Sequence, residues 1–143
     1  MSEPLLPPID DVSRPFFEGA LAGELRIPCC PETGRLFFPP REASPFAPHR
    51  PHGWQRVSGR GTIWSFVVPH PPLLPYYAER APYVVVAVAL EEEPSVRLVG
   101  NLLAAEGGPI EAVGAEEVAI GAPVRAVFEP VAPEIVLVRW LRL

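Results

Sequence analysis

The chain has 143 residues, of which 48% are hydrophobic and 20% are charged, a balance typical of a folded protein rather than a disordered one. All 12 basic residues are arginine, so the absence of lysine excludes chemistry based on a Schiff-base lysine or a P-loop lysine. The formal net charge of -5 argues against a protein that binds the phosphate backbone of a nucleic acid, and leaves open only a local basic face.

The N-terminal part of the chain is predicted to contain a short helix over residues 13–23. Ser13 suits the N-cap position, Pro15 the first turn, and Gly23 the end of the helix. Because so short a helix is not stable alone, its apolar side must pack against another surface. We therefore assign residues 1–24 to an N-terminal segment with a helix, and the irregular, proline-rich residues 25–53 to a second unit.

From residue 54 onward, β-branched and aromatic runs alternate with turn residues, which indicates strands. The expected strands are residues 54–68, 83–90, 95–103, 123–129 and 134–141, with a short helical element at 113–120. Gly59 and Gly61 lie in the first run, which suits a strand that coils to serve both sides of a barrel. This pattern predicts an all-β fold, with a five-stranded Greek-key OB-type barrel over residues 54–143.

The proline-rich unit contains the most specific motif of the chain. Cys29 and Cys30 are followed by Gly34 and by the run Phe38-Pro39-Pro40-Arg41. Together with Phe16-Phe17 in the predicted helix, this frame resembles the acyl-CoA-associated family of zinc-ribbon and OB-fold proteins known as domain of unknown function 35. The motif of that family runs C-x-x-C-G-x-x-x-F-P-P-R-x-x-C-x-x-C-G. The resemblance implies a rubredoxin-like zinc ribbon at residues 25–53.

The ligand positions of this ribbon have largely been lost. The motif places Cys30 at the first ligand position, but it places residues without a thiol at the other three, namely Thr33, Ser44 and Ala47. Because a structural zinc site needs four nitrogen or sulfur donors, we expect a degenerate ribbon that packs without zinc. An alternative metal site would use four residues of the same unit: Cys29, Cys30, His49 and His52.

No self-sufficient catalytic set is apparent in the sequence. Ser58 lies where a strand coils and not at a strand-to-helix elbow, and the only aspartates, Asp10 and Asp11, precede the predicted helix. His70, in a proline-rich loop, is either an acid-base group or a structural, solvated side chain. We predict that the isolated chain is not an enzyme. A free-standing acyl-CoA enzyme that uses His70 or a glutamate is the alternative.

The compartment follows from three observations. Adjacent cysteines cannot form an ordinary loop-closing disulfide, which agrees with a reducing environment. The N-terminus lacks a secretory signal, and no apolar run reaches the roughly 20 residues of a membrane-spanning helix. We therefore expect a cytoplasmic protein that does not associate with a membrane.

Two features are candidate contacts for coenzyme A or a partner. The apolar loop at residues 69–77 either faces outward toward a protein or an acyl chain, or folds back as a lid over the barrel. The arginines between the ribbon and the first strand either grip phosphates or are solvated. The candidate contacts are Phe38, Arg41, Arg56, Arg60, His70, Leu74, Tyr76 and Tyr77, and no residue is assigned to catalysis or to a metal.

The resemblance implies that the chain functions as a subunit of a larger complex. Such proteins accompany thiolase-fold enzymes or hot-dog hydratases that use coenzyme A thioesters. It therefore implies a non-catalytic accessory subunit that pairs with a thiolase-fold acyltransferase, condensing enzyme or retro-aldolase. One alternative is a subunit of a hot-dog acyl-CoA hydratase, and a homodimer within the heterocomplex is left open.

The other alternative is an OB module that binds nucleic acid. Its second and third strands offer only Tyr83 as an aromatic residue and only Arg97 as a cation, and glutamates 91–93 would repel phosphate. We therefore expect no nucleic-acid partner.

Overall fold

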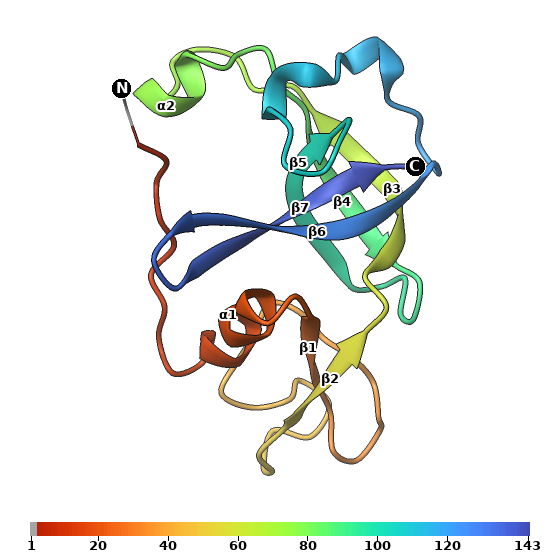
Figure 1. Ribbon diagram of the computed structural model, residues 1–143. Helices are drawn as coiled ribbons and strands as arrows, with labels where there is room; N and C mark the ends of the chain where they lie inside the picture. Colours follow the sequence, from red (N-terminus) through yellow and green to blue (C-terminus); the bar gives the residue numbers. More distant parts are fainter. Residues whose placement is uncertain (1–2) are drawn as a thin grey trace.

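The computed structural model describes residues 3–143 and shows a closed barrel beside a smaller two-stranded unit (Figure 1). The smaller unit contains α1 (Arg14–Leu21), β1 (Leu25–Cys29) and β2 (Gly53–Val57). The barrel strands are β3 (Arg60–Val67), β4 (Val85–Leu90), β5 (Arg97–Leu103), β6 (Pro123–Ala132) and β7 (Ile135–Arg142). A short helix, α2 (Pro75–Ala78), lies between β3 and β4, and two 3-10 turns (Ile110–Ala112 and Ala115–Glu117) lie between β5 and β6.

The two-stranded sheet corrects two expectations. β1 pairs with β2 in antiparallel fashion, from Leu25 opposite Val57 to Cys29 opposite Gly53, so the segment expected to be irregular contains a strand. The single strand expected over residues 54–68 is wrong, because its first part completes this sheet and only its second part enters the barrel. Gly59 has a φ of 81°, a left-handed conformation that ends one strand and redirects the next.

The barrel confirms the predicted all-β, OB-type fold. Its strand order is β3-β4-β5-β7-β6, and β3 closes the barrel by pairing with both β4 and β6. All neighbouring strands are antiparallel except β5 and β7, which are parallel and joined at only two residue pairs, Leu102 with Trp140 and Leu103 with Leu141. A Cβ at Gly61 would collide with the carbonyl oxygen of Ala89, so glycine permits the close approach of β3 to β4.

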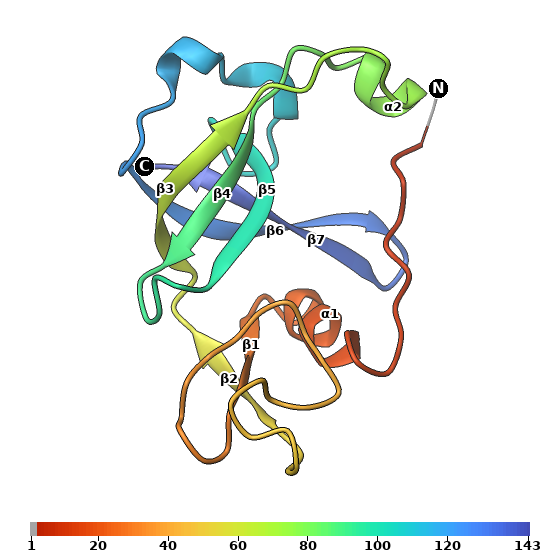
Figure 2. The same cartoon turned by 180° about the vertical axis from the view of Figure 1, so that it is seen from behind.

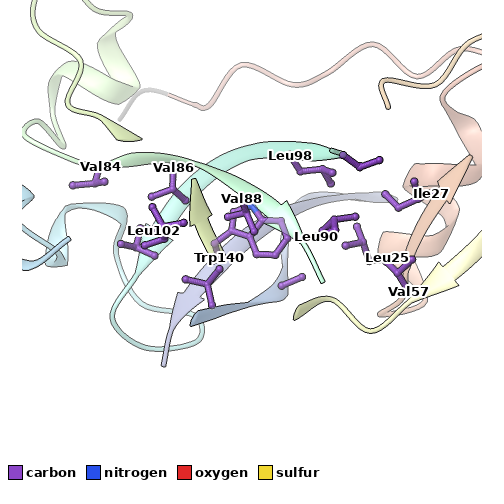
Figure 3. Packing of buried hydrophobic residues seen from close by; sticks show 14 of the residues in the cluster. Leu25, Ile27, Val57, Val84, Val86, Val88, Leu90, Leu98, Leu102 and Trp140 are labelled. Atoms are coloured by element: carbon purple, nitrogen blue, oxygen red, sulfur yellow. The ribbon is translucent and has the colours of Figure 1, made fainter. Parts of the chain in front are cut away.

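One apolar core connects the barrel to the two-stranded unit (Figure 3). Alternate residues of β4 point inward, as the period of a strand requires, and they pack around Trp140 of β7, whose side chain is fully buried. The same cluster continues into Leu25, Ile27 and Val57 of the two-stranded sheet. Shared burial therefore holds the two units together.

The predicted N-terminal helix is present as α1, which lies between β1 and the β6–β7 end of the barrel (Figures 1 and 2). Ser13 precedes the helix, but its side chain does not cap it. Instead, the Ser13 hydroxyl accepts a hydrogen bond from the backbone N–H of Asp10 at 3.2 Å. The helical element expected at residues 113–120 is replaced by the two 3-10 turns. Within residues 3–143, no helix combines the length and apolarity needed to cross a bilayer.

Candidate functional site

The ribbon keeps one of the four thiols of the zinc motif, that of Cys30. Cys30 and Ser44 are buried, and the hydrogen bond between their side chains joins the two turns of the ribbon. Within the second turn, Ser44 forms an isolated β-bridge with Ala47. Burial desolvates the Cys30 thiol, which raises its pKa, but hydrogen bonds with Ser44 and Thr33 outweigh this effect and lower the pKa to about 7. One thiol, two hydroxyls and a methyl group do not fit a structural zinc ion, which needs four nitrogen or sulfur ligands.

The alternative metal site is not assembled. The Cys29 sulfur lies 3.4 Å from the carbonyl oxygen of Gly34. His49 Nε2 lies 3.0 Å from a carboxylate oxygen of Glu32, whereas His52 Nε2 lies 2.6 Å from the carbonyl oxygen of Arg41. Across the described residues 3–143, no three His, Cys, Asp or Glu side chains converge as a metal site. That the ribbon packs without zinc stays a prediction.

A cavity of about 440 Å³ lies where β5 and β7 diverge, and we call it the β5–β7 cavity. Its walls come from residues 98–101 of β5 and 137–140 of β7. Its apolar rim includes Phe16 and Phe17 of α1, Phe38 of the ribbon, and Tyr77 of α2. The N-terminal segment contributes Pro7 as it passes from the vicinity of α2 to α1 (Figure 2). Its volume falls in the range of small-molecule sites.

The wall of the β5–β7 cavity contains a buried polar cluster. Arg139 is only 4% exposed, and its Nε donates to Glu129 Oε2 at 2.6 Å. Its Nη1 donates to Asn101 Oδ1, also at 2.6 Å. Two donors of this wall, Asn101 Nδ2 and Trp140 Nε1, are buried without a hydrogen-bond partner among residues 3–143. Sequence reasoning missed this cluster, although Asn101 and Arg139 are polar interruptions of apolar strands.

A second cavity, of about 630 Å³, lies along β3 and β6, and we call it the arginine cavity. Arg60 and Arg125, which are direct cross-strand neighbours, both line it, together with Glu91 and apolar residues. Arg125 Nη2 lies 3.4 Å from Glu106 Oε2. Arg60 forms no ion pair within residues 3–143. The cavity thus combines two guanidinium groups and one carboxylate with a largely apolar lining.

The predicted contact residues do not form a single site. Phe38 and Tyr77 both line the β5–β7 cavity, whereas Arg60 lines the arginine cavity. Arg41 lies in a shallow pocket beside Trp54. Arg56 pairs with Glu24 at 3.3 Å.

The proline-rich loop is partly folded onto the barrel. Tyr77 packs against the buried Tyr83, with ring centroids 5.7 Å apart, as the lid interpretation predicted. Leu74, by contrast, is 54% exposed, and His70 is exposed as well. Tyr76 lies under the guanidinium of Arg80 at 3.6 Å. The loop therefore completes the barrel end on one side and presents apolar surface on the other.

The chain matches two family models. The rubredoxin-like zinc ribbon domain of ChsH2 matches residues 17–44, and the C-terminal OB-fold domain of ChsH2 matches residues 54–129. A curated relative is the 3-oxo-4,17-pregnadiene-20-carboxyl-CoA hydratase alpha subunit of Mycobacterium tuberculosis (strain ATCC 25618 / H37Rv), which is 39% identical over 113 residues. The match covers 79% of this chain but only 32% of the relative, so the chain spans about a third of that protein.

Two solved structures resemble the fold. A chain of the Ltp2-ChsH2(DUF35) aldolase superposes with a TM-score of 0.79 at 29% identity, covering 95% of this chain and 98% of that chain. A protein of unknown function of the DUF35 family from Sulfolobus solfataricus has a TM-score of 0.59 at 14% identity, with 93% and 86% coverage, and shows the fold alone. Since one ChsH2 model alone spans more than half of the sequence, the chain belongs to the ChsH2 group of the domain of unknown function 35 family, with its zinc-ribbon and OB-fold architecture.

Proposed function

We propose that this chain is a non-catalytic accessory subunit of a complex that uses acyl-CoA thioesters, and that a thiolase-fold partner carries the catalytic residues. The observation that carries the proposal is the end-to-end match, at a TM-score of 0.79, with a chain of the Ltp2-ChsH2(DUF35) aldolase. The name of the curated relative adds a coenzyme A thioester as substrate. This chain would then bind the partner and would not itself catalyse the reaction.

The arginine cavity supports a contact with the phosphates of coenzyme A. Like charges directly opposite each other on paired strands repel, so Arg60 and Arg125 are less stable as neighbours than an oppositely charged pair would be. A bound phosphate would offset this repulsion, because guanidinium groups bind phosphate oxygens through strong, charge-assisted hydrogen bonds. Arg60 is exposed and forms no ion pair within residues 3–143, so its donors are available.

Co-expression of the chain with its genomic neighbours, followed by size exclusion and mass spectrometry, tests the proposal. A stoichiometric complex with a thiolase-fold enzyme is expected, and calorimetry of that complex should show acyl-CoA binding. A chain that stays monomeric beside those neighbours and binds no acyl-CoA would contradict it.

A hydratase complex is the second candidate, because the curated relative is the alpha subunit of a hydratase. The fold of the co-purified partner separates the two candidates, since a hot-dog subunit in place of a thiolase would favour the hydratase. A free-standing enzyme is tested by turnover of the isolated chain and by its loss in a His70→Ala variant. His70 lies at an exposed position of the proline-rich loop.

A further inference from the structure

The outer side of the first three barrel strands presents an apolar surface. The strand registers place Val67 beside Val85, and Ala87 beside Val99. Figure 2 shows β3, β4 and β5 on the outside of the described part of the chain, with no helix in front of them. Its larger apolar side chains are mostly exposed, with values of 52% for Trp64, 59% for Val67 and 71% for Val99. We call this surface the β3–β5 face, and it consists of Trp64, Val67, Val85, Ala87, Arg97 and Val99.

β4 lacks the alternation that is expected of a strand with one side in water. It is apolar at every position, and its outward residues are Val85, Ala87 and Ala89, whereas the residues between them pack into the core. A strand that is apolar on both sides is typical of a sheet that is covered on both sides. A contiguous apolar surface that stays exposed marks a site of interaction. The composition of β4 therefore favours a further surface that covers its outer side.

Trp64 and Arg97 form the centre of the β3–β5 face. The Arg97 Cζ atom lies 3.7 Å from the centroid of the Trp64 ring, so the two side chains meet across β4. This cation–π contact fixes both side chains before binding, which lowers the entropy cost of an interface. Tryptophan and arginine are also the residues that most often dominate the affinity of protein interfaces. A neighbouring hollow of about 140 Å³, lined in part by Val67 and Val99, is large enough for one apolar side chain.

The charge of the face selects the kind of partner. Arg97 forms no ion pair within residues 3–143, and neither does Arg60 of the arginine cavity. The two sites adjoin, because Ala89 lines the arginine cavity and lies directly opposite Arg97. A two-fold dimer through this face would place these cations against their own copies, which disfavours a second copy of the chain. A protein that presents a carboxylate beside an apolar side chain is complementary to it.

We propose that the β3–β5 face is the docking surface for the thiolase-fold partner, which places an apolar side chain against Trp64 and a carboxylate against Arg97. This inference rests on the accessory function proposed above. Docking at this face brings the partner beside the arginine cavity, so that one coenzyme A thioester can contact both subunits. Nucleic acid is another occupant of OB barrels, but glutamates 91–93 follow directly after the apolar part of β4 and repel phosphate.

Hydroxyl-radical footprinting of the co-purified complex provides the first test, with unaltered chains and mass spectrometry as the readout. Oxidation of Trp64 should be at least threefold slower in the complex than in the isolated chain. Leu21 of α1, which is 54% exposed, is the reference and should keep its rate. A complex in which Trp64 is oxidised as fast as in the isolated chain would overturn the docking surface and leave the accessory function standing. Failure to obtain any complex would contradict both.

Matched variants provide the second test. Trp64→Ala and Arg97→Glu should each weaken binding to the partner about 30-fold or more, as expected for interface residues that dominate affinity, in chains that keep their native circular dichroism. Leu21→Ala and Arg14→Glu make the corresponding changes at exposed positions of α1 and should leave the affinity unchanged. Unchanged affinity in both folded face variants would refute the proposal. It would also fail if Trp64→Ala dissociated a dimer of the isolated chain, or if that chain bound oligothymidylate in a salt-sensitive manner.

Discussion

Restoring the lost thiols should convert the ribbon into a zinc site. In a tetrahedral site with zinc–sulfur distances of about 2.3 Å, the sulfur atoms lie roughly 3.8 Å apart, which is close to the range of a hydrogen bond to sulfur. The Cys30 thiol already makes such contacts with Thr33 and Ser44, and Ala47 bridges to Ser44. In the triple variant Thr33→Cys, Ser44→Cys, Ala47→Cys, the thiols at 33 and 44 would therefore lie beside Cys30, and we expect the thiol at 47 to complete the set of four.

The stabilisation expected from zinc binding to the triple variant follows from mass action. A ligand at about 1,000 times its dissociation constant stabilises the folded state by about 4 kcal/mol, which for a chain of this length raises the melting temperature by roughly 10–15 °C. Elemental analysis should find one zinc per triple variant, and thermal unfolding with and without a chelator should give the shift. The double variant Thr33→Ser, Ala47→Ser adds no thiol and is the control.

Two results would refute this reasoning. A triple variant that folds but binds no zinc would show that the four positions do not converge as the knuckle geometry requires. Stoichiometric zinc in the unaltered chain would show that donors outside the four motif positions hold a metal.

Three further predictions concern single side chains. Because the fold lowers the pKa of Cys30 from 9.0 to about 7, the unfolded chain holds a proton between these pH values that the folded chain has released. The free energy of unfolding should thus rise with pH from 7 to 9 in chemical denaturation, and a Cys30→Ala variant should lose this rise. Arg60→Ala should weaken acyl-CoA binding by the complex about 10-fold in calorimetry. The control variant Arg56→Ala should not weaken this binding, because Arg56 pairs with Glu24. Equal losses of affinity in both variants would exclude the arginine cavity as the site of the coenzyme A phosphates. Gly61→Ala should destabilise the barrel by about 1–3 kcal/mol in urea, since the added methyl group meets a backbone carbonyl, and an unchanged midpoint would contradict that close approach.

The strands of the barrel could be predicted because each is a run of apolar, β-branched residues between turn residues. The division of residues 54–68 was missed because Gly59 and Gly61 were interpreted as the bend of one coiled strand, whereas the left-handed conformation of Gly59 separates two strands. β1 was missed because Pro28 argues against a strand. A proline is nevertheless accommodated here, because the sheet has only two strands.

The ribbon positions could be predicted from the motif, since Cys30 and its three replacements are fixed by spacing along the chain. The polar cluster of the β5–β7 cavity could not, because Asn101 lies 38 residues before Arg139, on a strand that is not its neighbour in sequence. Asn101 meets Arg139 only after β5 and β7 align in parallel. No pattern in the sequence around either residue predicts their contact.

The short parallel junction between β5 and β7 gives α1 a part in closing the barrel wall. Where the strand ladder ends, the phenylalanines of α1 form the boundary of the cavity. A partner protein that shifted α1 would change the shape available to a ligand, and a ligand would resist or favour that shift. Partner affinity and ligand affinity would then be thermodynamically linked, each altering the other by the same factor.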